Sequence, residues 1–132
     1  MNIQIATNPH QSARLLMYGV NPDTADRLLY GNVLSDQTRG SGEIPDYAIP
    51  SWSLSALLAL LPAVIRKDII TFFLTFGTCS DEEGCNYWEV SYFNNQVGSG
   101  SVLYCCEAPD PIEACIRMVK ILIDGGHTLN TK

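Results

Sequence analysis

The run of β-branched and aromatic residues from Ile69 to Phe76 constrains the fold more than any other segment of the chain. Such residues favour extended backbone, and successive side chains of a strand point to opposite faces. The alternation places four large apolar side chains on one face of this strand: Ile70, Phe72, Leu74 and Phe76. That face needs a covering layer, so the segment predicts a β-sheet with one face packed in the core.

Two later segments continue the alternation after short connections. Residues 87–93 place Trp88 and Val90 on one face and Glu89 on the other, and residues 102–106 are again rich in apolar side chains. Consecutive strands joined by short loops pair antiparallel. We therefore expect a three-stranded antiparallel meander.

Three predicted helices begin with the same sequence feature, a short polar N-cap residue followed by proline. The three starts are Asn8-Pro9, Asn21-Pro22 and Asp110-Pro111. The apolar residues that follow predict helices over about 9–18 and 22–30, and a closing helix that ends at Gly125-Gly126. The closing helix carries one apolar stripe, which we expect to lie on the sheet: Ile112, Cys115, Ile116, Val119, Leu122 and Ile123.

Together these segments predict a single α+β domain over residues 1–132, with N-terminal helices, a three-stranded antiparallel meander and a C-terminal helix packed on one face of the sheet. The length is that of one ordinary domain with one core. Eight positions in the strands and the closing helix are expected to be almost fully buried: Ile70, Phe72, Leu74, Trp88, Val90, Ile116, Val119 and Leu122.

Residues 54–65 predict a further helix that is apolar nearly all round, which Pro62 should kink or end. Surplus apolar surface on a small chain marks an interface, and symmetric dimers are the commonest way to cover it. We therefore expect a homo-oligomer. Alternatively, the irregular segment 31–50 folds back over this helix. Its covering side chains would then be Ile44, Tyr47 and Ile49.

The charge balance excludes some classes of partner. Eight Lys and Arg against fourteen Asp and Glu give a net charge of −6, which opposes the phosphate neutralisation that nucleic-acid binding needs. The apolar runs fall short of the roughly 20 residues of a membrane span, and the N-terminus lacks the basic start of a secretory signal. We expect a cytoplasmic protein with no nucleic-acid and no membrane partner.

The five cysteines are an odd number in a chain without a secretory signal, so we expect reduced thiols. The C-x2-C spacing that converging zinc ligands use is absent. The acidic segment 81–83 fits no calcium-binding loop and is expected at an exposed hairpin tip. We therefore expect no metal and no cofactor.

Three segments form a pattern in this order: residues 14–20 (RLLMYGV), residues 50–54 (PSWSL) and Asp110-Pro111. The pattern resembles that of small proteins encoded by phages and mobile elements of gut Bacteroidales. The resemblance covers nearly the whole chain, but its motifs are helix caps and core positions. It implies the fold and a mobile-element origin, and it carries over no catalytic residue. The chain departs from the group in the loop 79–85, with its two cysteines and three acids.

One stretch of the chain combines groups that suit an anionic ligand. Arg39 lies in a glycine-rich segment, and Tyr47 and Trp52 follow it. A nucleotide-like anion could use the cation, the flexible amides and the aromatic faces together. These three residues are the candidate ligand-binding residues, and the competing interpretation is an ordinary surface loop.

The sequence contains no catalytic motif, which favours a binding role. We expect a non-enzymatic accessory protein that sequesters or blocks a host protein or a small nucleotide-like ligand. The alternative is a small hydrolase whose site is assembled only in three dimensions. Its candidate groups are Cys115, His127, His10 and the acidic segment 81–83.

Overall fold

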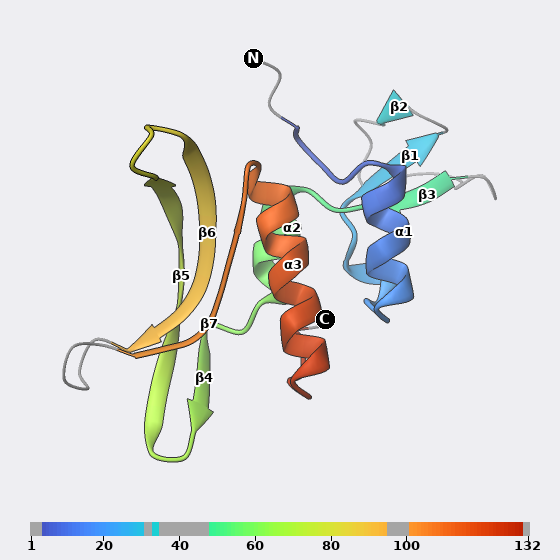
Figure 1. Cartoon of the computed structure of the whole chain (residues 1–132). Helices are drawn as coiled ribbons and strands as arrows, with labels where there is room; N and C mark the ends of the chain where they lie inside the picture. The colour runs from blue at the N-terminus through green and yellow to red at the C-terminus, as the bar shows by residue number, and fades with distance from the viewer. Residues whose placement is uncertain (1–3, 31–32, 35–47, 95–100, 131–132) are drawn as a thin grey trace. The chain divides into compact units, whose positions relative to one another are not determined.

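The computed structural model describes residues 4–30, 33–34, 48–94 and 101–130 (Figure 1). The chain divides into two compact units, the first ending at Leu60 and the second comprising Leu61–Asn130. Each unit contains helix and antiparallel sheet, so the predicted α+β class is confirmed. Within the described ranges, no helix has both the length and the apolar character to cross a membrane.

In its described residues, the first unit contains two helices, a 3-10 turn and a small sheet. Its elements are α1 (Pro9–Met17), η1 (Pro22–Thr24), β1 (Arg27–Tyr30), β2 (Val33–Leu34), β3 (Ala48–Ser51) and α2 (Leu54–Leu60). The three strands pair antiparallel in the order β2-β1-β3. The sequence predicted the first helix but not this sheet.

Helix α1 begins and ends as its sequence predicts. The backbone N–H of Gln11 donates to Asn8 Oδ1 (2.8 Å), and the backbone N–H of Asn8 donates to Gln11 Oε1 (3.1 Å). This reciprocal pair satisfies backbone donors that an α-helix leaves free at its start. Gly19, just beyond the helix, adopts a φ of +93°, which glycine reaches without steric cost.

The predicted helix over residues 22–30 is wrong. Pro22–Thr24 forms only the single turn η1, and β1 follows it. Residues 27–30 pair with residues 48–51 of β3, and the Asp26 carboxylate accepts hydrogen bonds from Ser53. A helix of this length is not stable by itself. The tertiary pairing therefore decides the conformation of the segment.

The part of the second unit that the structure describes is a four-stranded curled sheet with one helix. Its elements are β4 (Val64–Lys67), β5 (Ile70–Ser80), β6 (Asn86–Asn94), β7 (Ser101–Ala108) and α3 (Pro111–Asp124). The strands pair antiparallel in sequence order, β4-β5-β6-β7. The predicted meander corresponds to β5, β6 and β7, and the prediction of only three strands is wrong.

The extra strand arises because the predicted helix over 54–65 is too long. Helix α2 ends at Leu60, before Pro62, which cannot continue it. Residues 64–67 become β4 and pair with the start of β5 across a turn at Asp68 and Ile69. Asp68 adopts a φ of +58°, a left-handed conformation that Asp tolerates better than most residues.

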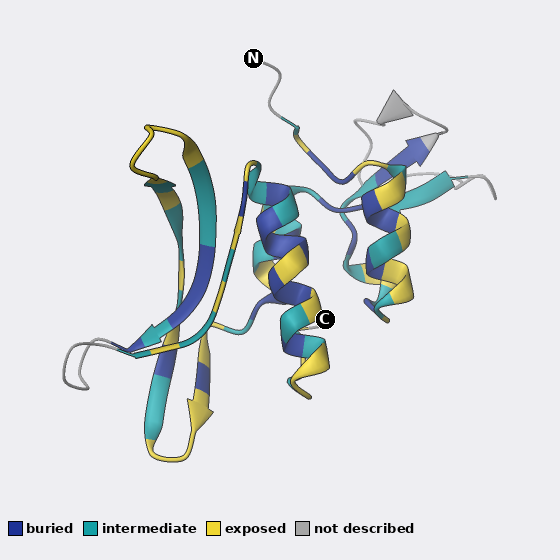
Figure 2. Ribbon diagram, in the orientation of Figure 1, coloured by how far each residue is buried: buried dark blue, intermediate teal, exposed yellow. Residues whose placement is uncertain are grey.

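Helix α3 begins at its predicted cap and packs against β6 and β7. The backbone N–H of Ile112 donates to Asp110 Oδ1 (2.8 Å). Figure 2 shows buried residues along β6 and along α3, and exposed residues at both hairpin ends of the sheet. Five of the eight predicted core positions are buried: Phe72, Val90, Ile116, Val119 and Leu122. The other three, Ile70, Leu74 and Trp88, are only partly covered.

Candidate functional site

The face of the four-stranded sheet that points away from α3 is the candidate site, and we call it the open face. On the helix side, the Cys106 thiol donates to the Ala114 carbonyl (3.2 Å) and the Tyr104 hydroxyl lies 2.8 Å from His127 Nε2. Strand alternation sends the intervening side chains to the open face. They are Val64, Arg66, Thr71, Phe73, Thr75, Cys79, Tyr87, Glu89, Ser91, Phe93, Val102, Cys105 and Glu107.

Four apolar side chains form one row across all four strands of the open face. This apolar row consists of Val64, Phe73, Phe93 and Val102, each paired with the next on the neighbouring strand. Three of them remain largely exposed: Val64 by 46%, Phe73 by 49% and Val102 by 56%. Contiguous exposed apolar side chains on a small chain are typical of a binding surface.

A pocket of about 540 Å³ adjoins the apolar row at the β4–β5 hairpin. Its lining combines two residues of the row with one cation and several smaller groups: Val64, Phe73, Arg66, Ile69, Ile70, Thr71 and Asn94. The Asn94 amide donates to the Thr71 carbonyl (2.5 Å), which ties β6 to β5 beside the pocket. The volume is in the range of pockets that hold small molecules.

Two thiols flank one carboxylate farther along the open face. The Cys79 thiol donates to Glu89 Oε2 (3.0 Å), and the Cys105 thiol donates to Glu89 Oε1 (3.4 Å). The hydrogen bond to Glu89, together with burial, raises the pKa of Cys79 above its usual value. Burial, with a further contribution from Glu89, raises the pKa of Cys105 to about 11. Both thiols therefore stay protonated at neutral pH and are poor nucleophiles.

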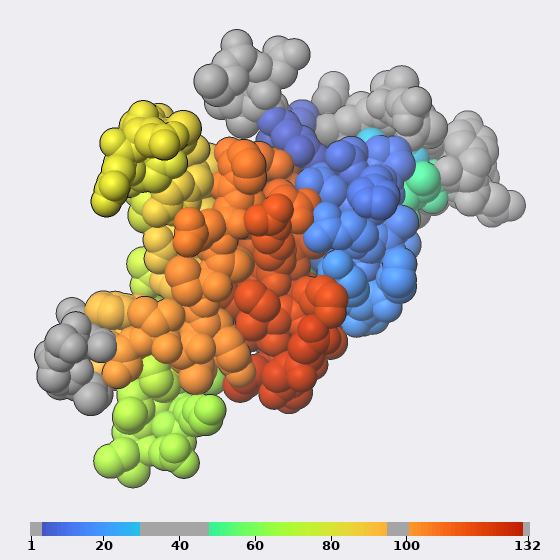
Figure 3. Space-filling model, in the orientation of Figure 1, coloured from blue at the N-terminus to red at the C-terminus, as the bar shows by residue number. Residues whose placement is uncertain are grey.

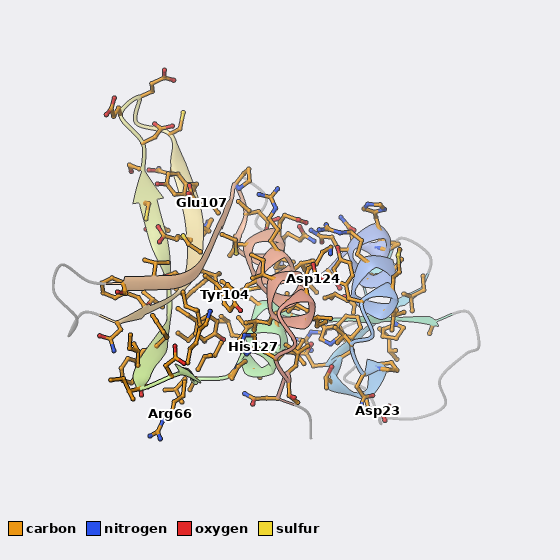
Figure 4. All side chains as sticks on the ribbon, turned by 60° about the horizontal axis from the view of Figure 1, so that its bottom comes forward. Asp23, Arg66, Tyr104, Glu107, Asp124 and His127 are labelled. Atoms are coloured by element: carbon orange, nitrogen blue, oxygen red, sulfur yellow. The ribbon has the colours of Figure 1, made fainter. Side chains whose placement is uncertain are left out.

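The charges of the open face lie at its two ends. Arg66 is on β4, paired with Thr71 of β5, whereas Glu89 and Glu107 pair with each other across β6 and β7. Figure 4 shows Arg66 and Glu107 toward opposite ends of the sheet. The apolar row lies between them in the register. The open face is thus basic at one end, apolar in the middle and acidic at the other end.

The acidic segment 81–83 lies where it was expected, at the tip of a hairpin. Asp81 Oδ1 accepts hydrogen bonds from the backbone N–H groups of Glu83 (2.9 Å) and Cys85 (2.8 Å). All residues from Asp81 to Cys85 are exposed. In Figure 3 this turn, coloured yellow, projects beyond β7. The segment closes the β5–β6 turn.

The candidate ligand-binding residues are not assembled into a described site. Arg39 and Tyr47 lie outside the residues that the structure describes. Trp52 is fully buried, and its indole N–H donates to Thr24 Oγ1 (2.9 Å). The Trp52 backbone N–H donates to Thr7 Oγ1 (3.0 Å), within a buried cluster of hydroxyl groups. In this arrangement Trp52 holds the first unit together and shows no exposed ring face.

The proposed hydrolase groups are also apart. Cys115 is buried in α3, where burial raises the pKa of its thiol to about 12. His127 follows the helix end at Gly125, and about 15 Å of helix separates Gly125 from Cys115. His127 pairs instead with Tyr104, and His10 is an exposed residue in the first turn of α1. The structure does not bring Cys115 and His127 together as a nucleophile and its base.

The five cysteines are free thiols in the structure. Within the described ranges, no three or more His, Cys, Asp or Glu side chains are grouped as metal ligands. The two thiols beside Glu89 thus form hydrogen bonds to a carboxylate rather than part of a larger ligand cluster.

The apolar row is the functional feature that the sequence did not reveal. Alternation already separated Phe73 from the core-facing Phe72, but it did not show which residues lie beside Phe73. Val64 was assigned to a helix, and the pairing of Phe93 with Val102 follows a register shift next to Tyr92. The signal that could have revealed β4 is Asp68, a residue suited to a left-handed turn between two apolar segments.

No family model, no curated protein and no solved structure matches the chain. The function must therefore be inferred from the chemistry of the open face. That chemistry is suited to association, since exposed apolar groups are flanked by charges and the neighbouring thiols are protonated.

Proposed function

We propose that the chain is a non-enzymatic accessory protein that acts by binding a protein partner on the open face of its four-stranded sheet. The observation that carries the proposal is the apolar row, in which Val64, Phe73 and Val102 are about half exposed. The row spans all four strands and gives an open contact surface rather than a closed cavity. Surfaces of this kind supply the apolar centre of protein interfaces, and charged residues form their rim.

The resemblance of the helix caps and core positions to proteins of phages and mobile elements supports the wider role. In this proposal the protein acts in the cytoplasm and sequesters or blocks a host protein. The pKa values of Cys79 and Cys105, both raised, support binding over thiol catalysis at this face.

The test compares three immobilised proteins in host lysate: wild type, Phe73→Ser and Met17→Ser. Met17 is an exposed apolar residue of α1 outside the open face, so its variant is a matched control for lost surface hydrophobicity. We expect one host protein to be retained equally by wild type and Met17→Ser, and at least about tenfold less by Phe73→Ser. Quantitative mass spectrometry of the bound fraction measures this.

Equal retention by all three proteins would contradict the use of the open face, as would no retention above empty resin. Circular dichroism confirms that each variant is folded. Titration of the same three proteins with a panel of nucleotides tests the small-ligand alternative, which predicts binding that Phe73→Ser leaves intact.

A further inference from the structure

The open face carries opposite charges at the two ends of one surface. Arg66 on β4 pairs with Thr71 of β5, and Glu89 on β6 pairs with Gly77 of β5. Six residues of β5 separate Thr71 from Gly77, a distance along the strand of about 20 Å. The apolar row crosses β5 at Phe73, between them.

In the part of the chain that the structure describes, neither acid at the acidic end forms an ion pair. Arg117 of α3 donates only to the backbone carbonyl of Glu107 and is paired with Glu113. Glu89 and Glu107 are directly opposite on neighbouring strands, an arrangement in which like charges are destabilising. The two thiols that donate to Glu89 supply hydrogen bonds but no positive charge. Among the described residues, Arg66 forms no ion pair either. Each end of the face thus presents charge that an opposite charge from outside would balance.

We propose that a second copy of this chain docks on the open face, with a two-fold axis relating the two sheets. This inference rests on the proposed use of the open face for protein binding and names its partner. A two-fold contact requires one surface that is complementary to itself, because residue i of each copy meets residue j of the other. Arg66 of each copy then faces Glu89 and Glu107 of the other. The apolar rows cover each other between the two sets of charges.

An oblique two-fold axis between the sheets allows this contact. Arg66 lies on the edge strand β4 and the two acids lie on β6 and β7, so the axis that exchanges them runs across the strands at an angle, between Arg66 and the acids. The strands of the two copies then cross, as in the orthogonal class of sheet packing, and the two apolar rows cross each other near the axis. A host protein that binds the open face competes with the second copy, so dilution of the dimer favours that complex.

The test uses exchanged charges and sedimentation analysis of the full chain. We expect wild type to sediment as a dimer, with twice the 14.5 kDa of one chain. Arg66→Glu and Glu107→Arg should each raise the dimer dissociation constant at least about tenfold, because each places like charges in contact twice. An equimolar mixture of the two variants should dimerise more tightly than either variant alone. In the mixed pair the unchanged Arg66 faces two acids, and the two introduced charges, at positions 66 and 107, are opposite; only the contact with one Glu89 joins like charges.

Lys67→Glu is the matched control. It makes the same charge change as Arg66→Glu on the same strand, but its side chain points to the other face of β4. It should leave the dissociation constant within about twofold of wild type. High salt should weaken the wild-type dimer and have less effect on the charge-reversed variants.

Three results would overturn the inference: a monomeric wild type at about 100 µM, a dimer that Arg66→Glu leaves intact, or a mixture of variants that stays monomeric. None of them affects retention of a host protein by the open face, which the lysate experiment measures separately. Conversely, a dimer that responds to the charge exchanges stands even if lysate retains nothing.

Discussion

Phe72 and Phe73 show how much one residue of register decides in this sheet. Phe72 is 5% exposed and belongs to the core, whereas Phe73 is 49% exposed and belongs to the apolar row. Phe72→Ala should lower the free energy of unfolding by about 3–5 kcal/mol, since it removes a buried ring. Phe73→Ala should cost about 1 kcal/mol or less. Urea unfolding followed by circular dichroism measures both, and equal losses would contradict the assignment of the two faces.

The thiols beside Glu89 give a second prediction for single residues. In Glu89→Gln the negative charge next to Cys79 is lost, so its thiolate is less disfavoured and its pKa falls. Alkylation of Cys79 by iodoacetamide at pH 8 should therefore be faster than in wild type, as measured by mass spectrometry of the peptides. Cys105 should respond less, because burial is the larger cause of its raised pKa. An unchanged rate at Cys79 would show that Glu89 does not control it.

Cys115 is the internal control for this experiment. Its thiol is buried in α3, and burial is the main cause of its raised pKa. Its slow alkylation should be the same in wild type and Glu89→Gln. Faster alkylation of Cys115 in the variant would mean that the substitution loosens the second unit rather than changing one local charge.

Among the secondary structure elements, the sequence predicted correctly those whose ends are fixed by local contacts. Helices α1 and α3 both start where an Asn or Asp side chain accepts a hydrogen bond from a nearby backbone N–H. The sequence failed where strand pairing decides: β1 pairs with β3, which is distant in the chain, and β4 pairs with β5 across a two-residue turn. Short segments with mixed preferences follow their tertiary partners.

The candidate site could not be predicted from the sequence for the same reason. A row across four strands depends on the register of three strand pairs, and alternation within one strand does not specify register. The charge composition gives the net charge of −6. It does not predict that Arg66 is separated from Glu89 and Glu107 along one face of the sheet. The sequence candidates Arg39 and Tyr47 stay a prediction, since they lie outside the described residues.

Helix α2 is held at its start by Asp26, which contacts Ser53 although the two residues are far apart in the chain. Asp26 Oδ1 accepts from the Ser53 backbone N–H (2.8 Å), and Asp26 Oδ2 accepts from the Ser53 hydroxyl (2.5 Å). Ser53 Oγ in turn accepts from the Ala56 N–H (3.2 Å). Asp26→Ala should lower the free energy of unfolding by about 1–2 kcal/mol, because it removes the group that orients this cap.

Asp26→Asn is the conservative comparison. Its amide oxygen can still accept a hydrogen bond from Ser53, so it should lose less stability than Asp26→Ala. Chemical denaturation of the two variants measures the difference. If both lose the same amount, the carboxylate acts through its charge rather than as an acceptor.

At the scale of the whole molecule, the described structure indicates that self-association would use the four-stranded sheet rather than the helices. The sequence assigned surplus apolar surface to the predicted helix over residues 54–65. Leu57 and Leu60 of α2, and Ala114 and Met118 of α3, are already buried within one chain. Among the described residues, the exposed large apolar side chains that lie side by side on paired strands are those of the row on the open face. Self-association therefore stays a prediction, with the sheet as its surface.

Because thiol and phenol groups are buried in the folded chain, its stability falls at alkaline pH. Burial raises the pKa of Cys115 to about 12 and of Cys106 to about 11, and it also raises the pKa of Tyr92. The thiols have a pKa of 9.0 when unperturbed, so above that pH the unfolded chain releases protons that the folded chain retains. Fewer bound protons in the unfolded state make the free energy of unfolding fall as pH rises. The contribution is fully present below pH 9.0 and is lost progressively from there toward about pH 12.

Cys115→Ala isolates the contribution of one thiol to this decline. Each group that ionises only on unfolding contributes a slope of about 1.4 kcal/mol per pH unit. The variant is less stable at every pH because it loses a buried side chain, but its free energy of unfolding should fall less steeply between pH 9.5 and 11. Urea unfolding at a series of pH values measures the slope, and a reducing agent keeps the thiols free. An unchanged slope would contradict the raised pKa of Cys115 in the folded chain.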